Sequence, residues 1–331
     1  MPSHPTPGLA PRSITPIPTL PAGPGLVGVR LSATESTGLD WRLVDETWRA
    51  AGEEHAISAA WLSDHLSDAS SDRNGPAFES LTLAAALARR VGGKFVGIAV
   101  VANTFRHPAV LAKSATVLDD VTGGRFILGL GAGWHEGEHD AFGIPLPPPR
   151  ERFDRYESAL RVLGALFSDE ARHRPGVSLE DPFYPLRSAT NEPGTVRHGG
   201  PLLWTGVQGP RGIALAARYA SGWPMPGNRP GNVPYFTAKR AEIRRALEAA
   251  GRDPEAFTFA AQLSVGTTPA DRRKALVAAR AFVAAGANHV ILGLPASLAP
   301  DGLRALIDEV AEPLLDRVSS REARGRHPET S

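Results

Sequence analysis

Cysteine is absent from the 331-residue sequence, which excludes a disulfide scaffold, a thiolate zinc site and a cysteine nucleophile. An excess of one charge is also missing, since 36 Lys and Arg residues are balanced by 35 Asp and Glu residues. A nearly neutral chain has no basic field to recruit nucleic acid or an anionic membrane. We therefore expect neither partner, and expect a small-molecule substrate instead.

Long apolar runs are lacking as well. No stretch of about 18 uninterrupted apolar residues occurs, because even the alanine-rich segment 275–294 contains Arg280 and Asn288. The first 24 residues are rich in proline and have no apolar segment typical of a secretory signal. We expect a disordered extension over 1–24, a flexible tail over 319–331 and a cytoplasmic protein.

Short apolar and β-branched runs alternate with longer amphipathic runs along the rest of the chain. This alternation predicts βαβ units and a parallel sheet. Eight candidate strands occur, which is the number that closes a barrel. They cover residues 26–31, 57–63, 94–101, 125–131, 201–205, 222–225, 257–265 and 289–294.

Eight candidate helices follow these strands, and several begin with proline, whose missing N–H costs nothing at the first helical position. They cover residues 40–54, 77–90, 108–121, 149–167, 210–219, 235–250, 269–285 and 300–318. Segment 168–200 is rich in Pro, Gly and charge and is too long for an ordinary connection. The sequence thus predicts an α/β fold, a (β/α)8 TIM-like barrel over 25–318. We expect 168–200 to be an insertion after the fourth helix that flanks the active-site mouth.

The candidate strand at 57–63 is followed by two titratable residues, Asp64 and His65. In a (β/α)8 barrel the active site lies at the carboxyl ends of the strands. One interpretation is that Asp64 caps a helix and His65 is solvated. The other is that His65 points into the barrel mouth, where an imidazole can transfer a proton near neutral pH.

Glycines at 129, 131 and 133 end another candidate strand, which suggests a backbone brought close to a planar or phosphorylated ligand. As a dinucleotide-binding fingerprint this segment is weak, because a third glycine at the right spacing and an acidic ribose residue are not evident. The adjoining HEGEH at 135–139 matches the zinc-protease pattern H-E-x-x-H. It follows a glycine-rich strand end and contains Gly137, so we predict no metal site and expect Glu136 and Glu138 to cap or line the loop.

Four segments together resemble one family. They are SDH at 63–65, the run from Asn103 to Pro145, RFDRYESALRVL at 152–163 and PLLWTGVQGPRGIALAARYASGW at 201–223. These segments are similar to the luciferase-like monooxygenase superfamily, and in particular to its F420-dependent oxidoreductase branch, which includes methylenetetrahydromethanopterin reductase. The resemblance covers about residues 25–295. It implies a TIM-like barrel with an insertion and a deazaflavin or flavin ring at the strand ends.

The resemblance also implies the site residues. In members that use F420, the Asp and His of the SDH-type motif face the ring, so it assigns Asp64 and His65 to the cofactor and His65 to catalysis. It implies a non-prolyl cis peptide at Ala99-Val100 that supports the ring from behind. Further cofactor-binding residues that it implies are Asn103, then Gly131, Ala132, Gly133 and Trp134 beside the ring and ribityl chain, and Gly206, Val207, Gln208, Gly209 and Pro210 at the phosphate.

Three positions depart from the patterns of the superfamily. Val207 replaces a glycine of the usual Gly-Gly-x-Gly segment. Trp134 stands where sugar-phosphate dehydrogenases carry a carboxylate, and Ala69 stands where they carry an aromatic residue. Without that carboxylate the sugar-oxidising mechanism loses its proton donor, so we do not predict it. The resemblance instead favours hydride delivery from reduced cofactor to an electrophilic C=C, C=N or C=O group.

The leading hypothesis is therefore an oxidoreductase that transfers a hydride between coenzyme F420 and a small organic substrate, in the reductive direction. An FMN-dependent monooxygenase of the same fold is the alternative enzyme, and a non-catalytic flavin-binding barrel is the alternative from another class. Titratable residues at the mouth, chiefly His65, argue against the last. We expect Phe105, Trp134 and Phe183 to line the substrate pocket, and we consider a homodimer as one assembly.

Overall fold

The computed structural model describes residues 26–31, 40–67, 76–227, 231–294 and 300–316. The expected extension over 1–24 and tail over 319–331 lie outside the described residues, and so does Ala69. No helix within the described ranges is long and apolar enough to cross a membrane.

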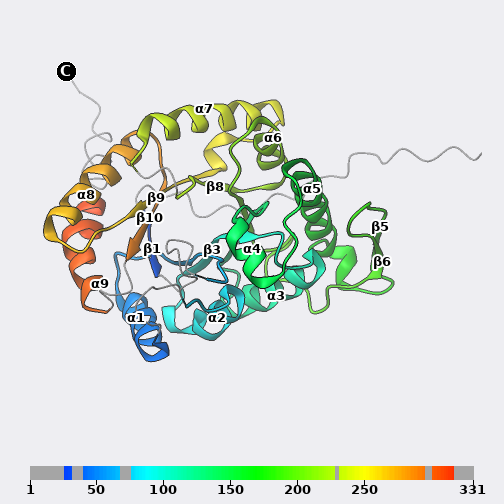
Figure 1. Ribbon diagram of the computed structural model, residues 1–331, viewed down its shortest axis with the longest axis horizontal. Helices are drawn as coiled ribbons and strands as arrows, with labels where there is room; N and C mark the ends of the chain where they lie inside the picture. The colour runs from blue at the N-terminus through cyan, green and yellow to red at the C-terminus, as the bar shows by residue number, and fades with distance from the viewer. Residues whose placement is uncertain (1–25, 32–39, 68–75, 228–230, 295–299, 317–331) are drawn as a thin grey trace, which may run out of the picture.

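Eight parallel strands close a barrel in the order β1-β10-β9-β8-β7-β4-β3-β2, which confirms the predicted (β/α)8 architecture. The helices form a ring around these strands (Figure 1). The barrel strands are β1 Leu26–Leu31, β2 Ala59–Leu62, β3 Phe95–Ala102, β4 Phe126–Gly131, β7 Leu202–Thr205, β8 Gly222–Pro224, β9 Thr258–Ser264 and β10 His289–Leu294.

Most helices of the described chain lie where the sequence predicts them, and α3 and α6 begin at the predicted prolines. The α-helices are α1 Trp41–Glu53, α2 Ser80–Leu87, α3 Pro108–Val121, α4 Glu136–Phe142, α5 Pro149–Leu166, α6 Pro210–Tyr219, α7 Val233–Ala249, α8 Pro269–Ala284 and α9 Asp301–Leu306. Short 3-10 turns add η1 Ala88–Val91, η2 Asp169–Arg172 and η3 Pro254–Ala256, and a π-helical turn, η5 Ile307–Ala311, follows α9. The short helix α4 was not predicted.

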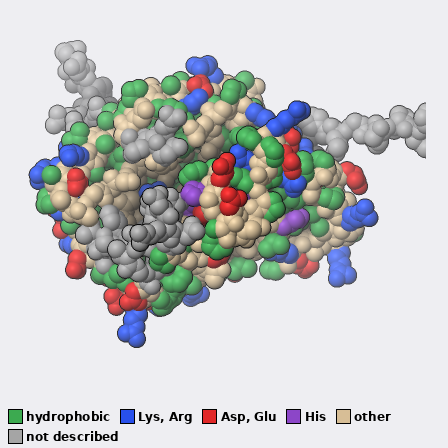
Figure 2. All heavy atoms as spheres, in the orientation of Figure 1, with side chains coloured by type: hydrophobic (Ala, Val, Ile, Leu, Met, Phe, Trp, Pro, Cys, Tyr) green, Lys and Arg blue, Asp and Glu red, His purple; other side chains and the backbone are tan. Residues whose placement is uncertain are grey.

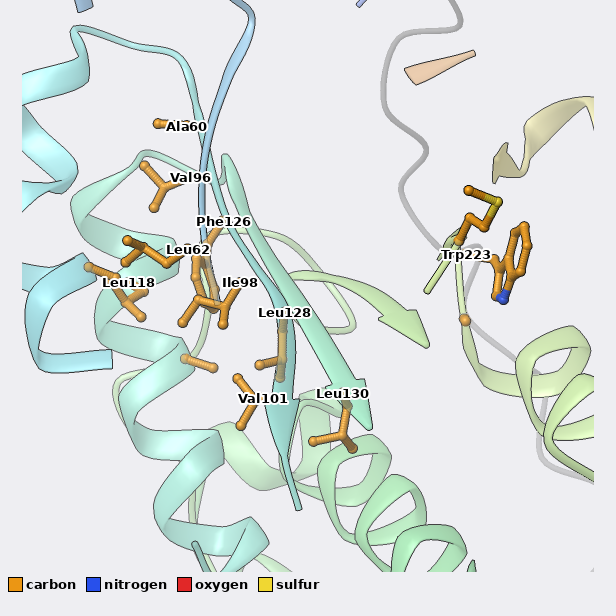
Figure 3. Packing of buried hydrophobic residues seen from close by; sticks show 14 of the residues in the cluster. Ala60, Leu62, Val96, Ile98, Val101, Leu118, Phe126, Leu128, Leu130 and Trp223 are labelled. Atoms are coloured by element: carbon orange, nitrogen blue, oxygen red, sulfur yellow. The ribbon is translucent and has the colours of Figure 1, made fainter. Parts of the chain in front are cut away.

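The apolar core has two layers because successive strand residues face opposite sides of the sheet. Outward-facing residues of β2, β3 and β4 pack against the surrounding helices, and Figure 3 shows them near Leu118 of α3. Inward-facing residues form a separate cluster that includes Trp61, Ile127, Trp204 and Ile291. The rings of Trp61 and Trp204 lie 4.9 Å apart inside the barrel. The interior of the barrel is therefore a packed core and not a pore.

Residues 168–200 follow α5 and contain an antiparallel pair, β5 Val177–Leu179 and β6 Leu186–Ala189, that is separate from the barrel sheet. The pair lies outside the ring of helices (Figure 1). Asp181 accepts a 2.6 Å hydrogen bond from Arg161 of α5. The insertion thus covers the outer side of α3 and α5 more than the barrel mouth that we expected it to flank.

Two aromatic residues of this insertion show how far it reaches along the helices. The ring of Tyr184 lies 5.1 Å from that of His107, which caps the N-terminus of α3 at the strand-end side. Phe183 packs against the guanidinium of Arg155 on α5, 4.7 Å from it, in place of the pocket-lining position that we expected.

Candidate functional site

The segments that follow β2, β3, β4 and β7 meet at one side of the barrel mouth, because these four strands are neighbours in the sheet. The expected cofactor-binding residues lie in or directly after these strands. Acidic and histidine side chains lie together on the face of the molecule where α4 is found (Figure 2). The structure thus gathers residues that are far apart in the sequence.

His65 lies directly against Glu138, a residue of α4. The Nδ1 atom of His65 is 2.9 Å from Oε2 of Glu138. The Glu138 side chain is only 1% exposed, whereas that of His65 is 23% exposed. The other oxygen of Glu138 accepts the backbone N–H groups of Leu66 and Ser67 at 2.6 and 3.1 Å. One buried carboxylate therefore fixes both the ring of His65 and the backbone that follows it.

The hydrogen bonds of Glu138 also determine its charge. Burial by itself raises the pKa of Glu138, but the hydrogen bond and attraction of His65, together with the N–H groups of Ser67 and Leu66, outweigh burial and lower the pKa. The carboxylate is therefore ionised and acts as an acceptor, so Nδ1 of His65 carries the hydrogen between them. Among the described residues, the Nε2 atom of His65 has no hydrogen-bond partner.

The rings of Trp134 and His135 lie beside the imidazole of His65. The His65 ring centre lies 6.3 Å from that of Trp134 and 6.4 Å from that of His135, both at edge-on angles. Trp134 is 67% exposed, which is unusual for so large an apolar side chain. His135 is the N-cap of α4 and accepts the N–H of Glu138 at 3.0 Å. This cap positions Glu138, and Trp134 offers an apolar surface beside His65.

Asp64 is engaged by the protein itself. Both of its oxygens accept from the guanidinium of Arg106, at 2.7 and 2.8 Å, and Ser80 donates a further bond at 2.6 Å. Its Oδ2 also accepts the N–H of Ala102 in β3 at 2.8 Å. Arg106 additionally contacts Glu79. These bonds make Asp64 a support that holds β2, β3 and Arg106 together, and its expected contact with the cofactor ring stays a prediction.

The expected cis peptide is present between Ala99 and Val100, and the register of β3 against β4 shifts there. The bulge brings the Val100 side chain against the glycines of the adjoining strands. A Cβ would lie 3.0 Å from a Val100 methyl at Gly129, 2.7 Å at Gly131 and 3.2 Å at Gly206. Gly131 and Gly206 therefore make room for Val100, whereas Gly129 makes room first for the backbone carbonyl of Ile98.

The segment after β3 contains Asn103 and Thr104. Asn103 is 3% exposed, and its Oδ1 has no hydrogen-bond partner among the described residues. The carbonyl of Gly133 accepts a 2.9 Å hydrogen bond from Arg152. Gly133 has a positive φ of 87°, and Thr104 occupies the space that a side chain at this position would need. The buried, unpaired oxygen of Asn103 suits a ligand that donates a hydrogen bond.

The HEGEH pentad does not have the geometry of a zinc protease. His139 is 1% exposed and both of its ring nitrogens are engaged, since Nδ1 donates to the His135 carbonyl at 2.7 Å and Nε2 accepts from Thr104 at 2.8 Å. His135 precedes the helix as its cap. In the part of the chain that the structure describes, no three His, Cys, Asp or Glu residues are grouped to hold a metal ion.

The N-terminus of α6 offers open backbone donors. Its N-cap, Gly209, makes no side-chain cap, and a Cβ placed there would meet nothing within 4 Å. Val207 is 4% exposed, packs on Gly212 and accepts a bond from Trp223 through its carbonyl. Its side chain therefore lies against the first turn of α6, while Gly209 itself stays without a side-chain cap. Gln208 accepts a 2.9 Å bond from Tyr235.

This fold and this mouth define a (β/α)8 barrel with a histidine and carboxylate pair at the strand ends. Residues 26–326 match the family described as luciferase-like monooxygenase. The chain therefore belongs to this family, whose members are oxidoreductases.

Relatives with named activities cover part of the chain. It is 33% identical over 237 residues to a phthiodiolone/phenolphthiodiolone dimycocerosates ketoreductase of Mycobacterium tuberculosis, across 64% of this chain and 58% of that protein. It is 31% identical over 202 residues to an F420-dependent glucose-6-phosphate dehydrogenase of Kineococcus radiotolerans, across 60% of this chain and 57% of that protein. The chain thus spans less than two thirds of the length of these relatives.

A solved structure agrees on the fold. An EDTA monooxygenase from a Chelativorans species superposes with a TM-score of 0.70 at 17% identity, covering 89% of this chain and 94% of that chain. At this identity the likeness concerns the barrel alone.

Proposed function

We propose that the protein transfers a hydride between coenzyme F420 and a small organic substrate, in the reductive direction and toward a C=O group. The observation that carries the proposal is the partly exposed imidazole of His65, fixed at the strand ends by the buried carboxylate of Glu138. The ketoreductase relative supports a carbonyl substrate, and the F420-dependent relative supports the cofactor.

The residues at the mouth fit such a cofactor. The Val100 bulge and the glycines beside it form an apolar wall against which a planar ring can lie. The unpaired oxygen of Asn103 is an acceptor at this wall. The uncapped end of α6 at Gly209 supplies backbone N–H groups and a helix dipole for a phosphate.

When bound, F420 supplies the hydride, and the protein supplies position and a proton. Glu138 accepts the Nδ1–H of His65 and so fixes the orientation of the imidazole ring, including its Nε2 atom. In the imidazolium form, Nε2–H donates to the oxygen of the carbonyl that is reduced. The exposed indole of Trp134 lies edge-on to His65 and offers an apolar surface to a substrate.

An FMN-dependent monooxygenase is a second candidate, favoured by the fold shared with the EDTA monooxygenase. The two candidates differ in which cofactor binds. Titration of the protein with F420 and with FMN, followed by cofactor fluorescence, tests the proposal. We expect saturable F420 binding at a ratio of one per chain and much weaker FMN binding. Tight FMN binding without F420 binding would favour the monooxygenase.

A further inference from the structure

The wall of the barrel opposite the proposed cofactor wall contains a partly buried cation. Strands β9, β10 and β1 are neighbours, and they face β3, β4 and β7 across the barrel. Val29 and Leu31 of β1 belong to the outward-facing core, so the residue between them, Arg30, points inward. Arg30 lies one residue before the end of its strand. It therefore lies near the mouth.

The fold seats the guanidinium of Arg30 in a defined place. Its Nη1 donates to Oε1 of Gln262 at 3.0 Å, and Gln262 is fixed in turn by a 2.7 Å bond to the Met225 carbonyl. Gly293 leaves the necessary room, because a Cβ there would lie 2.9 Å from Nη2 of Arg30. Three strands or strand ends thus hold one side chain.

The cation has no matching anion among the described residues, where its one hydrogen bond goes to the neutral amide of Gln262. Burial lowers the pKa of Arg30, the direction expected for a cation withdrawn from water. A guanidinium nevertheless stays protonated in proteins. A partly buried cation that lacks a counter-charge is unfavourable, and an anionic ligand relieves that cost.

We propose that Arg30 binds a carboxylate of the substrate, so that the enzyme acts on organic acids that also carry a reducible carbonyl. Because Gln262 occupies Nη1, the edge formed by Nε and Nη2 is available for a two-point contact with a planar carboxylate. Strand β2, which leads into His65, is paired with β1 and lies between β1 and β3. The substrate would then extend from Arg30 toward the cofactor wall. This substrate class rests on the proposed function, whereas the carboxylate site itself does not.

The test measures binding in cofactor-free protein through quenching of tryptophan fluorescence by 4-nitrobenzoate and by its neutral counterpart 4-nitrobenzamide. We expect the wild type to bind the carboxylate about 10- to 100-fold more tightly, the range of a charge-assisted two-point contact. Arg30→Met should abolish this preference, and Arg30→Lys should keep part of it. Arg187→Met, on the exposed side of β6, is the matched control and should keep the full preference.

Equal affinity of the wild type for the two probes would overturn the proposal, and so would a full preference that survives in Arg30→Met. Circular dichroism shows whether Arg30→Met folds. If it does not, the comparison of the wild type with Arg30→Lys tests the carboxylate site. An unchanged preference for 4-nitrobenzoate in Arg30→Lys contradicts a two-point contact. F420 binding is measured separately. A protein that prefers 4-nitrobenzoate but binds no F420 would retain the Arg30 site and lose the proposed function.

Discussion

His65 and Glu138 act as one unit at the scale of single residues. The carboxylate holds the ring through Nδ1 and holds the adjoining backbone through the N–H groups of Leu66 and Ser67. A side chain oriented by a buried group loses little freedom when it meets a ligand. The pair therefore has the features expected of a proton donor with its positioning residue.

Replacing His65 by Ala should lower the rate of hydride transfer by about 10²–10⁴-fold, which is the usual contribution of a positioned acid–base group. The affinity for F420 should stay within about tenfold, because the imidazole acts mainly on the reacting substrate. Cofactor titration and single-turnover oxidation of reduced F420 measure the two quantities. His198→Ala, with a side chain that is 76% exposed, is the control and should behave as the wild type. Unchanged transfer in His65→Ala would refute the catalytic assignment.

Replacing Glu138 by Gln should produce a stability difference that depends on pH. The pKa of Glu138 in the folded protein lies below its ordinary value of 4.5, so its charge adds stability that is fully present above pH 4.5. That stability is lost as the pH falls through the folded-state pKa. We expect the wild type to exceed Glu138→Gln by about 1–3 kcal/mol at pH 7 in urea unfolding. A difference that stays constant into strong acid would contradict this charge assignment.

The candidate site could be predicted from the sequence in part. The sequence indicated His65 as a candidate because this residue follows a strand, where this fold builds active sites. The sequence did not indicate Glu138 as the partner of His65, since Glu138 is 73 positions away and lies in the HEGEH segment that resembles a zinc-protease motif. Arg106 was missed as the partner of Asp64 because the two residues are also far apart in the sequence. Arg30 reads in the sequence as an ordinary polar residue of a strand, and only barrel closure shows that it faces inward.

At the scale of elements, β1 and β10 begin and end where the apolar runs do, because parallel strands are buried on both faces and read as continuous apolar segments. Helix α4 could not be predicted in this way. It has seven residues, contains Gly137 and depends on a cap by His135 and on a left-handed Gly143 at its end. The β5–β6 pair is similarly short, and the segments beside it are held by hydrogen bonds between Asn191 and α3 and between Asp181 and α5.

The bulge of β3 should tolerate no side chain at Gly131, because a Cβ would lie 2.7 Å from a methyl of Val100. We expect Gly131→Ala to cost about 1–3 kcal/mol of unfolding free energy, the range for overpacking. Val100→Ala should relieve the clash, so the double variant should be more stable than the sum of the two single changes. Gly164→Ala, in an open position of α5, is the control and should be neutral or slightly stabilising. Strict additivity in urea unfolding would rule out the contact.

The N-terminus of α6 should lose its affinity for a phosphate when a negative charge is placed on it. Gly209 has a φ of −89° that any residue can adopt, so Gly209→Asp should fold and cap the helix. We expect the affinity for F420 to fall at least about tenfold through repulsion and loss of donors. Gly209→Asn caps without charge, and its smaller loss isolates the electrostatic part. Equal affinities for F420 in Gly209→Asp and the wild type would place the phosphate elsewhere.

At the scale of the whole molecule, closing the barrel sets two chemically different walls against each other. Strands β3, β4 and β7 present Val100, glycines and the open end of α6, whereas β1, β9 and β10 present Arg30 and Gln262. The packed tryptophans Trp61 and Trp204 fill the interior. In the proposed function, a planar cofactor lies on the first wall, with a substrate between it and the second.

A crystal structure of the protein with F420 tests this account most directly. We predict that the deazaflavin ring lies on the Val100 bulge, that its phosphate contacts the backbone N–H groups at the start of α6, and that Nε2 of His65 faces the carbon that carries the hydride. A ring bound away from the bulge, or with His65 turned away from that carbon, would contradict the proposed function.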